Sequence, residues 1–466
     1  MAEPAIARSI LRPWCVMPKT AVSLRPRIVG LETEYGCLTA TPGQSGNVVP
    51  QVRDWIFAAN RYGLIDRHDR RWDEPAGNGG FLFNGGRLYL DMGHVEYCTA
   101  ECATLQDVLR QDRAGDRMLL EALRDLGLAS EVQFIRNNID HHSGATFGCH
   151  ENYSMLRHAP FSERNLLSLL AFLTLRVLFT GSGRVGGASD GSGGPGVNFQ
   201  ISQRADYIEN DFFEWVQQSR AIINTRDEPL ADPRKYRRLH LLHGDTHVLP
   251  SALYLKLGAT RLVLDLLEAD DLPEVALLEA VPALRSISRQ PDGPWPVTLH
   301  DGREVDAVEL LRQFRTRANA RFRGRDAETD AVLALWRRVE EGLAGNRESL
   351  IGVIDWVTKR HLLEAFRQSE NLSWNDPWLE AQDLEYHQID PDRSLGLAVA
   401  DLNGPWGENL DDPKALTTAP GDTRAARRAA LMRQIAERGT LAVVDWNYVA
   451  EAGEDPTPML DPYRSG

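Results

Sequence analysis

Two glutamates near the start of the chain have the spacing of a pair of metal ligands. In the segment Gly-Leu-Glu-Thr-Glu they occupy positions 32 and 34, and side chains two residues apart on a strand project from the same face. Carboxylates this close repel one another unless a cation lies between them. Hard oxygen ligands of this kind suit Mg²⁺. Glu32 and Glu34 on a solvated edge strand would give the same pattern, so the pair needs support from other residues.

A second group of ionisable residues follows a predicted strand at 86–91. Arg87, Tyr89 and Asp91 share one face of this strand, and leucines occupy the other. A histidine and Glu96 come directly after it. A tyrosine and an aspartate aimed together with these residues favour a reactive site. A half-buried structural strand with a local salt bridge is the alternative.

Candidate ligands for an anion lie later in the chain. Arg204 ends a predicted strand at 199–204, Arg226 lies in a polar cluster before a proline, and Arg238 and His240 share a strand face. Arginine forks match phosphate oxygens in a bidentate manner. Each arginine could instead form a structural ion pair. Together with the paired carboxylates, these residues predict a nucleotide site that is built on a sheet.

Two other motifs exclude familiar kinds of site. The Gly-rich stretch 181–196 is not followed by Gly-Lys-Ser/Thr, so it is not a phosphate-binding P-loop, and a surface loop is expected there. The run Cys149–Tyr153 contains His150 but lacks the HExxH spacing of a metalloprotease, and by itself it could be only a turn.

The elements that must position these residues are interspersed without strict alternation of strand and helix. This pattern favours an α+β fold over a doubly wound sheet. Periodicity predicts strands at 28–30, 86–91, 132–137, 199–204, 239–242 and 441–444, and helices at 52–59, 105–126, 166–179, 253–268, 424–437 and through most of 300–370.

Composition narrows the classes of partner. The net charge is −14, and an acidic surface repels phosphate backbones, so nucleic acid is not an expected partner. No apolar run is long enough for a signal peptide or a membrane helix, so we expect a cytoplasmic protein with no membrane partner. Five cysteines, an odd and sparse set, do not predict a disulfide framework.

Seven motifs together resemble one protein family. In chain order they are GLETEYG, GGRLYLDMGHVEY, GCHENY, QISQRADYIE, INTRDEP, KYRRLHLLHGD and YLKLGATRLVLDLLE. They are similar to motifs of the family that contains the Pup ligase and the Pup deamidase/depupylase. The resemblance implies a glutamine-synthetase-like fold. Residues 27–404 would form a large catalytic domain whose curved antiparallel sheet makes an open cradle. A loosely ordered leader, 1–26, would precede it, and 405–466 would form a linker and a small C-terminal domain.

The same resemblance implies a role for each candidate residue. The expected metal-binding residues are Glu32, Glu34, Tyr89 and Glu96, the expected catalytic residue is Asp91, and the expected nucleotide-binding residues are His150, Arg204, Arg226 and His240. The implied cofactors are Mg²⁺ and ATP, or ADP plus phosphate. The implied partners are a small Pup-like protein modifier and its conjugates, in a bacterial proteasome system.

The two branches of the family catalyse different reactions. TGSGRVG (180–186), the ENLSW segment (370–374) and the length of the LYLDMGHVEY motif resemble the depupylase. The short segment between Gly36 and Asp91 resembles the ligase. We therefore expect an ATP- and Mg-dependent amidohydrolase that deamidates the C-terminal Gln of a Pup-like modifier or cleaves the modifier–lysine isopeptide bond. A ligase that forms that bond through a glutamyl phosphate is the first alternative, and a small-molecule carboxylate–amine ligase is the second.

Overall fold

The computed structural model describes residues 26–41, 43–71, 73–140, 144–186, 197–215 and 219–464. The expected leader, apart from Pro26, lies outside the described residues, as does the Gly-rich stretch 187–196.

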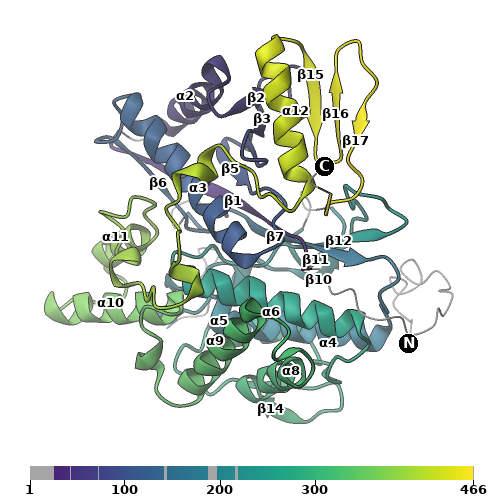
Figure 1. Cartoon of the computed structure of the whole chain (residues 1–466). Coiled ribbons are helices and arrows are strands. Elements are labelled where there is room, and N and C mark those ends of the chain that lie inside the picture. The colour runs from purple at the N-terminus through teal and green to yellow at the C-terminus, as the bar shows by residue number, and fades with distance from the viewer. Residues whose placement is uncertain are drawn as a thin grey trace.

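A large sheet of ten described strands organises the molecule (Figure 1). The strands follow the order β10-β11-β12-β7-β1-β5-β4-β3-β2, with β6 paired to the second half of β1. All of these pairs are antiparallel except β10–β11. The strands are β1 (Val29–Thr39), β2 (Gly63–Ile65), β3 (Gly79–Leu82), β4 (Arg87–Asp91), β5 (His94–Cys98), β6 (Val132–Ile135), β7 (Cys149–Leu156), β10 (Asn210–Phe213), β11 (Ala221–Asn224) and β12 (Tyr236–Leu241).

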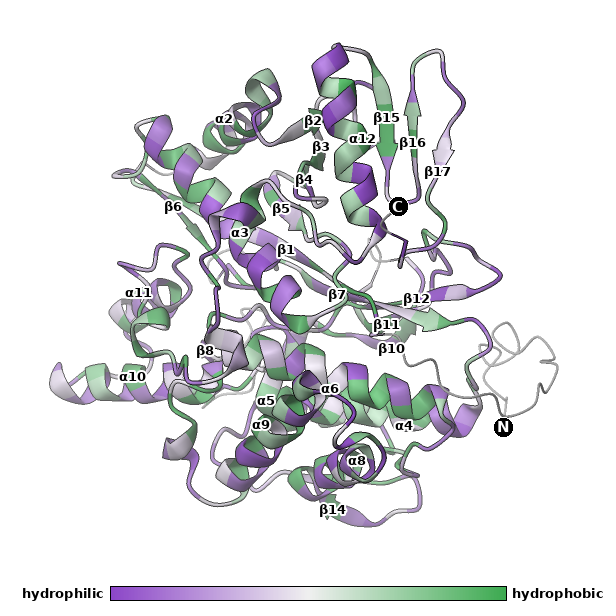
Figure 2. Ribbon diagram, in the orientation of Figure 1, coloured by the Kyte–Doolittle hydropathy of each residue, from purple (hydrophilic) through white to green (hydrophobic). Residues whose placement is uncertain are grey.

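Helices pack against the apolar face of this sheet. The described α-helices are α2 (Ser45–Phe57), α3 (Leu105–Asp125), α4 (Glu163–Leu175), α5 (Val177–Thr180), α6 (Pro250–Glu268), α7 (Ala280–Ser288), α8 (Ala307–Phe322), α9 (Ala327–Ala344), α10 (Asp355–Ser369), α11 (Pro377–Tyr386) and α12 (Arg424–Arg438). Short 3₁₀ helices lie at Ala58–Asn60, Ala205–Tyr207, Arg347–Leu350, Leu397–Val399, Pro405–Gly407 and Pro413–Leu416. Hydrophobic and hydrophilic residues alternate around α3 (Figure 2), as expected of a helix with one face on a core, whereas α4 is buried on all sides from Ser168 to Leu175.

Alternation along the central strands separates the core from a polar face. Leu31 and Tyr153 join the core formed with α4 and α6, while Tyr35 and Tyr97 join a second core with α2 and α3. Their neighbours in sequence therefore project from the opposite face of the sheet. Most of the candidate site residues lie on that opposite face.

Smaller elements complete the chain. They are the pairs β8 (Arg184–Val185) with β9 (Phe199–Gln200) and β13 (Pro296–Thr298) with β14 (Glu304–Asp306), and the three-stranded sheet β15 (Ala442–Asp445), β16 (Tyr448–Glu451) and β17 (Thr457–Pro458). Figure 1 shows α12 and this last sheet beside β2 and β3. Phe81 of β3 packs edge-on against Trp446, at 5.0 Å between ring centroids.

The expected α+β class is confirmed, and most predicted helices and strands form, but two local predictions change. The strand expected at 199–204 ends at Gln200, because the Asp245 carboxylate accepts hydrogen bonds from the backbone N–H groups of Gln203 and Arg204 and from the Ser202 hydroxyl, and so holds a turn. The possible turn at 149–153 is instead the start of strand β7, and β5 is a strand for which no prediction was made.

Strand β7 carries one acidic residue, Glu151, on the side of the sheet that faces the helices, and the charge of this residue is neutralised. Glu151 is fully buried and accepts hydrogen bonds from both terminal nitrogens of Arg176, at 2.6 and 2.9 Å. Burial opposes ionisation of Glu151, but Arg176 and Lys256 hold its pKa well below the usual range. The neighbouring side chains of β7 therefore face the polar side of the sheet.

A buried carboxylate attaches the C-terminal elements to the main sheet. Glu101, 8% exposed, accepts hydrogen bonds from Arg424 and Arg428 of α12, each at 2.6 Å. Burial alone would raise the pKa of Glu101, but Arg428 and Arg424 lower it to about 2.

Glu101→Gln is expected to destabilise the protein by about 3–5 kcal/mol, because it leaves two buried guanidinium groups without a charge partner. The folded-state pKa lies below the unfolded value, so the stabilisation by Glu101 is present above about pH 4.5 and is lost as the pH falls toward 2. Denaturant unfolding at pH 7 and at pH 3 measures both effects. Equal stability of the two proteins at pH 7 would contradict the prediction.

Candidate active site

Register across the central strands brings the acidic residues together. Glu34 of β1 lies opposite Glu96 of β5, and Glu96 lies opposite Tyr89 of β4. One row away, Glu32 lies opposite His150 of β7. The polar face of the sheet therefore carries two adjoining clusters.

The first cluster consists of oxygen ligands alone. Each of Glu34, Asp91 and Glu96 offers a carboxylate oxygen, and the three oxygens lie within 4.8 Å of one another. Burial, followed by the charges of Glu32 and Glu34, raises the pKa of Glu96 well above its usual value. Burial and Glu34 raise the pKa of Asp91 in the same direction. This repulsion is what a bound cation would relieve, and an all-carboxylate set fits Mg²⁺.

A glycine makes room for this cluster. A Cβ atom at Gly148 would lie 2.6 Å from Glu34 Oε1 and 2.7 Å from His150 Nε2. Any larger residue would push these two side chains apart. The Gly-Cys-His sequence at the start of β7 thus allows the two clusters to adjoin.

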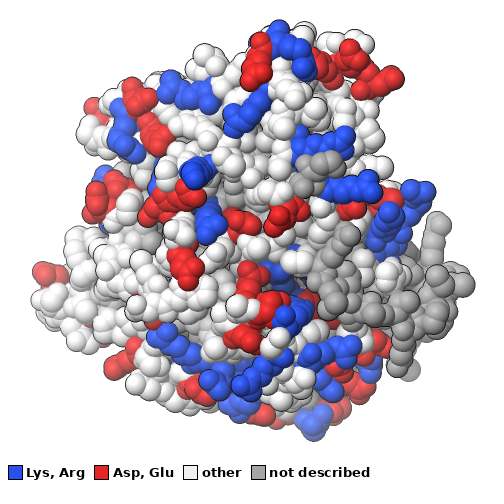
Figure 3. All heavy atoms as spheres, in the orientation of Figure 1, with Lys and Arg blue, Asp and Glu red and all other residues white. Residues whose placement is uncertain are grey.

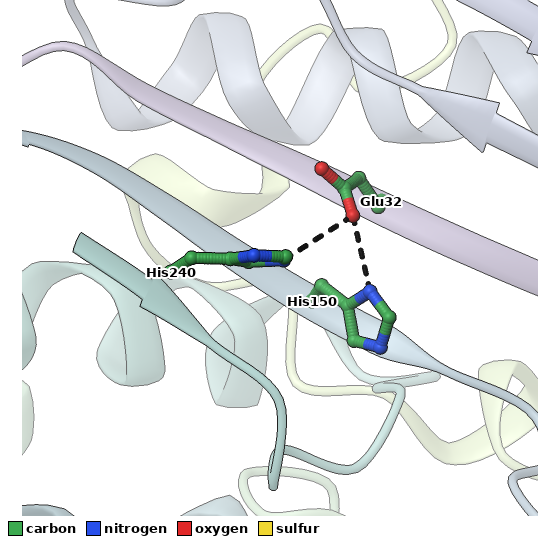
Figure 4. A group of neighbouring side chains, drawn as sticks. All are labelled: Glu32, His150 and His240. Atoms are coloured by element: carbon green, nitrogen blue, oxygen red, sulfur yellow. Dashed lines mark hydrogen bonds and ion pairs between the residues drawn. The ribbon is translucent and has the colours of Figure 1, made fainter. Parts of the chain in front are cut away.

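The second cluster mixes a carboxylate with two imidazoles (Figure 4). Glu32 Oε2 lies 3.0 Å from His150 Nδ1 and 3.5 Å from His240 Nε2, and the two rings meet edge to face at 5.3 Å. Burial alone would raise the pKa of Glu32, but His240 and His150 hold it well below the usual range. Burial lowers the pKa of His240, although Glu32 opposes this.

Two further polar residues extend this cluster: Asn152, which the sequence did not single out, and Arg238, which it named as a candidate anion ligand. Asn152 donates from Nδ2 to Glu32 Oε1 at 2.9 Å. Its Oδ1 accepts a hydrogen bond from Arg238 Nη1 at 3.0 Å. Asn152 follows His150 by two residues on β7, so alternation alone would have placed it on this face.

Arg204 is a buried cation without a side-chain partner. Its side chain is 3% exposed, and neither Nε nor Nη1 has a hydrogen-bond acceptor among the described residues. Burial lowers the pKa of the guanidinium, and Glu34 is the carboxylate that most opposes this change. A buried, unsatisfied guanidinium beside a carboxylate cluster fits an anionic ligand.

Arg204→Gln is expected to weaken nucleotide binding about 10- to 100-fold, because a charge-assisted contact to an anion is lost from a buried position. Isothermal titration with Mg²⁺ and ADP measures the change. The thermal midpoint should not fall, because Nε and Nη1 of the buried guanidinium have no hydrogen-bond acceptor among the described residues. An unchanged dissociation constant would remove Arg204 from the site.

Arg226 occupies a more open position than Arg204. It follows β11, its side chain is 44% exposed, and Nη2 lies 3.3 Å from Glu228 Oε1. His240 of β12 pairs with Asn224, two residues before Arg226. The structure thus places Arg226 at the rim of the polar face and His240 within it.

A cavity of about 110 Å³ opens beside the Glu32 cluster. It lies between the main sheet and the C-terminal elements. Its walls include Gly30, Glu32, Thr99, Asn152, Arg238 and Trp446. An aromatic ring, apolar walls and a few polar groups suit a planar heterocyclic ring. Thr99 and Trp446 were not predicted as site residues. Thr99 directly follows β5 and Trp446 lies near the end of the chain, and no pattern in the sequence indicates that these two segments come together.

Comparisons with known proteins agree with this architecture. The model of the Pup-ligase protein family matches residues 27–450. A depupylase from Acidothermus cellulolyticus is 37% identical over an alignment of 490 positions, which covers 94% of each chain. A Pup–protein ligase from Micrococcus luteus is 36% identical over 437 residues, 90% of this chain and 91% of the other.

Two solved structures also match. The Pup ligase PafA in its complex with Pup aligns with a TM-score of 0.81 and 31% identity over 95% of this chain and 90% of that one. PafA in complex with ADP aligns with a TM-score of 0.75 and 33% identity over 84% of this chain and 88% of that one. Fold and site thus define an α+β enzyme with an acidic sheet face. The chain belongs to the Pup-ligase family, as its motifs predicted. No described helix is both long and apolar enough to cross a lipid bilayer.

Proposed function

We propose that the protein is an ATP- and Mg-dependent amidohydrolase that acts on the C-terminal residue of a Pup-like modifier, either as the modifier's deamidase or as a depupylase that cleaves its isopeptide bond to lysine. The observation that carries the proposal is the placement of Asp91. Its carboxylate ends β4 beside Glu34 and Glu96 and makes no hydrogen bond or ion pair with any described residue. It is therefore available as a nucleophile or a base.

The surrounding residues supply the rest of the proposed chemistry. Glu32, Glu34, Glu96 and the Tyr89 hydroxyl would hold Mg²⁺. Bound there, the metal would stabilise negative charge on an oxygen and keep nearby carboxylates ionised. Asp91 would attack the amide carbon or take the proton of an attacking water. His94, which pairs with Asp91 across the β4–β5 hairpin, packs edge-on against Phe147 at 4.7 Å and so is held in place.

The nucleotide would occupy the cavity and the adjoining cations. Trp446 and Thr99 would hold its base end, and His150, His240, Arg204 and Arg226 would lie around its phosphates. Nucleotide binding itself is supported by one structural relative, a Pup ligase solved in complex with ADP. On the face drawn in Figure 3, positive and negative side chains are interspersed over most of the surface.

The ligase reaction is the second candidate. The segment between β1 and β4 is short, as the sequence pattern of ligases requires, and both solved relatives described above are ligases. The depupylase relatives favour the hydrolase. In a ligase, Asp91 would take a proton from the substrate lysine. In both cases the partner would be a Pup-like modifier serving a bacterial proteasome system.

Incubation with two forms of the modifier separates the reactions. One form ends in Gln and the other in Glu, and each is supplied with Mg-ATP and a lysine-bearing protein. The hydrolase proposal expects a mass gain of about 1 Da on the Gln form and no conjugate from the Glu form. A lysine conjugate formed from the Glu form, with the Gln form unchanged, would overturn it in favour of the ligase.

A further inference from the structure

One carboxylate at the rim of the polar face is shared by three arginines. Glu228 Oε1 lies 3.3 Å from Arg226 and 3.7 Å from Arg71, and Oε2 lies 3.3 Å from Arg238. Arg71 and Arg226 have no other ion pair among the described residues. The adjacent acid, Asp227, is committed to Arg157 at 2.6 Å. Three guanidinium groups therefore share one carboxylate, and two of them, Arg71 and Arg226, are open to solvent, with side chains 55% and 44% exposed.

The three arginines come from distant parts of the sheet. Arg71 lies in the connection between β2 and β3, at one end of the strand order, whereas Arg226 lies in the connection between β11 and β12 and Arg238 lies in β12, near the other end. Glu228 thus joins two opposite sides of the sheet. A purely local surface ion pair would not require a partner from the far side.

This carboxylate is also coupled to the Glu32 cluster. Arg238 binds both the side chain of Glu228 and, through Nε, its backbone carbonyl at 2.9 Å. The same guanidinium donates to Asn152, which donates to Glu32. The Glu228 carboxylate therefore lies two hydrogen-bonded residues away from a proposed metal ligand. Because this chain of hydrogen bonds links Glu228 to the proposed site, the Glu228 carboxylate occupies a position that an oxyanion of a bound substrate could use.

We propose that Glu228 is an internal substitute for a substrate oxyanion. In the ligand-free protein it holds Arg71, Arg226 and Arg238 together, and on binding it yields its place to an oxyanion of the substrate. Carboxylate and phosphate both accept bidentate contacts from guanidinium groups. The oxyanion is either a phosphate of the nucleotide or the free α-carboxylate of the modifier's last residue. This inference rests on the proposed function, because it assigns a further subsite to that reaction.

The proposal makes Glu228 a competitor, and that distinguishes it from a structural ion pair. If Glu228 competes, Glu228→Gln removes a charge that the ligand must displace, and affinity rises. If Glu228 instead fixes the arginines for the ligand, the same change loosens them and affinity falls. The two roles give opposite signs in one measurement.

The test measures two dissociation constants by titration calorimetry on the full chain. One arm uses Mg-ADP, and the other uses a peptide with the modifier's C-terminal sequence ending in Gln. Glu228→Gln is expected to tighten one of the two by about three- to tenfold. A gain in the first arm identifies the phosphate, and a gain in the second identifies the α-carboxylate. Asp227→Asn removes the same charge from the adjacent residue and should change neither.

A double variant tests the contribution of Arg71, which comes from the opposite end of the sheet. Once Glu228 is gone, Arg71 is free to contact the ligand, so Arg71→Gln in the Glu228→Gln background should abolish most of the gain. Binding by the wild type with no gain, or with a loss, in Glu228→Gln overturns this inference alone. A wild-type chain that binds neither ligand overturns the proposed function as well. Thermal midpoints of all variants verify that each one is folded.

Discussion

Asp91→Asn is expected to lower turnover about a thousandfold or more while the protein still folds and binds nucleotide. Asparagine has almost the same size and shape as aspartate, but it can neither accept a proton nor form a covalent intermediate. The wild-type carboxylate has no partner among the described residues that the substitution would disrupt, and burial together with Glu34 already raises its pKa. Removing its charge therefore relieves repulsion.

Deamidation or isopeptide cleavage, followed by mass spectrometry, measures the loss. Asp54→Asn is the matched control, because Asp54 lies on α2 with its side chain 63% exposed, and full activity is expected from it. Thermal unfolding of Asp91→Asn should show a midpoint equal to or above that of the wild type. Activity near the wild-type level, or a failure to fold, would contradict the role proposed for Asp91.

Removal of divalent cations is expected to weaken nucleotide binding about a hundredfold or more. Without a cation, the nucleotide phosphates would approach the carboxylates of Glu32, Glu34, Glu96 and Asp91. Two like charges about 4 Å apart near a protein surface repel by about 4 kcal/mol. The raised pKa of Glu96, caused by burial and then by Glu32 and Glu34, indicates that this repulsion is already present.

Calorimetric titration with ADP in Mg²⁺ and in EDTA measures the difference. Glu96→Gln should reduce the difference in ADP affinity between Mg²⁺ and EDTA. The variant has one carboxylate fewer to bind the metal when it is present and to repel the phosphates when it is absent. Equal affinity in Mg²⁺ and in EDTA would show that the acidic cluster does not hold a metal beside the nucleotide.

Alternation along single strands was enough to predict which side chains share a face. It placed Glu32 with Glu34, and Tyr89 with Asp91, and both pairs do project from the polar face. Alternation does not contain the register between strands, which depends on which strands pair and where. As a result, alternation could not show that Glu32 lies opposite His150 and Glu34 opposite Glu96, and the assignment of Glu32 and Glu34 to one metal site stays a prediction.

Two further features of the structure were not predicted, for other physical reasons. A carboxylate from a distant residue, Asp245, ends the strand before Arg204, and no local pattern in the sequence reports such a contact. Trp446 lines the cavity from the C-terminal elements, where Arg428 of α12 binds both Glu101 and the backbone carbonyl of Trp446, and no local pattern in the sequence reports these contacts. The assignment of roles to His150, Arg204, Arg226 and His240 came from the resemblance to the family, and these roles stay predictions.

The attachment of α12 to Glu101 has a consequence for the order in which the protein folds. Arg424 and Arg428 are separated from Glu101 by 323 and 327 residues, so the cavity closes only after a very long stretch of chain has been searched. Contacts of such high sequence separation form late, because the entropy of closing the chain must be overcome before they contribute. In refolding experiments, the helical signal should therefore recover well before the capacity to bind nucleotide. A refolding intermediate would expose the acidic sheet face without its wall.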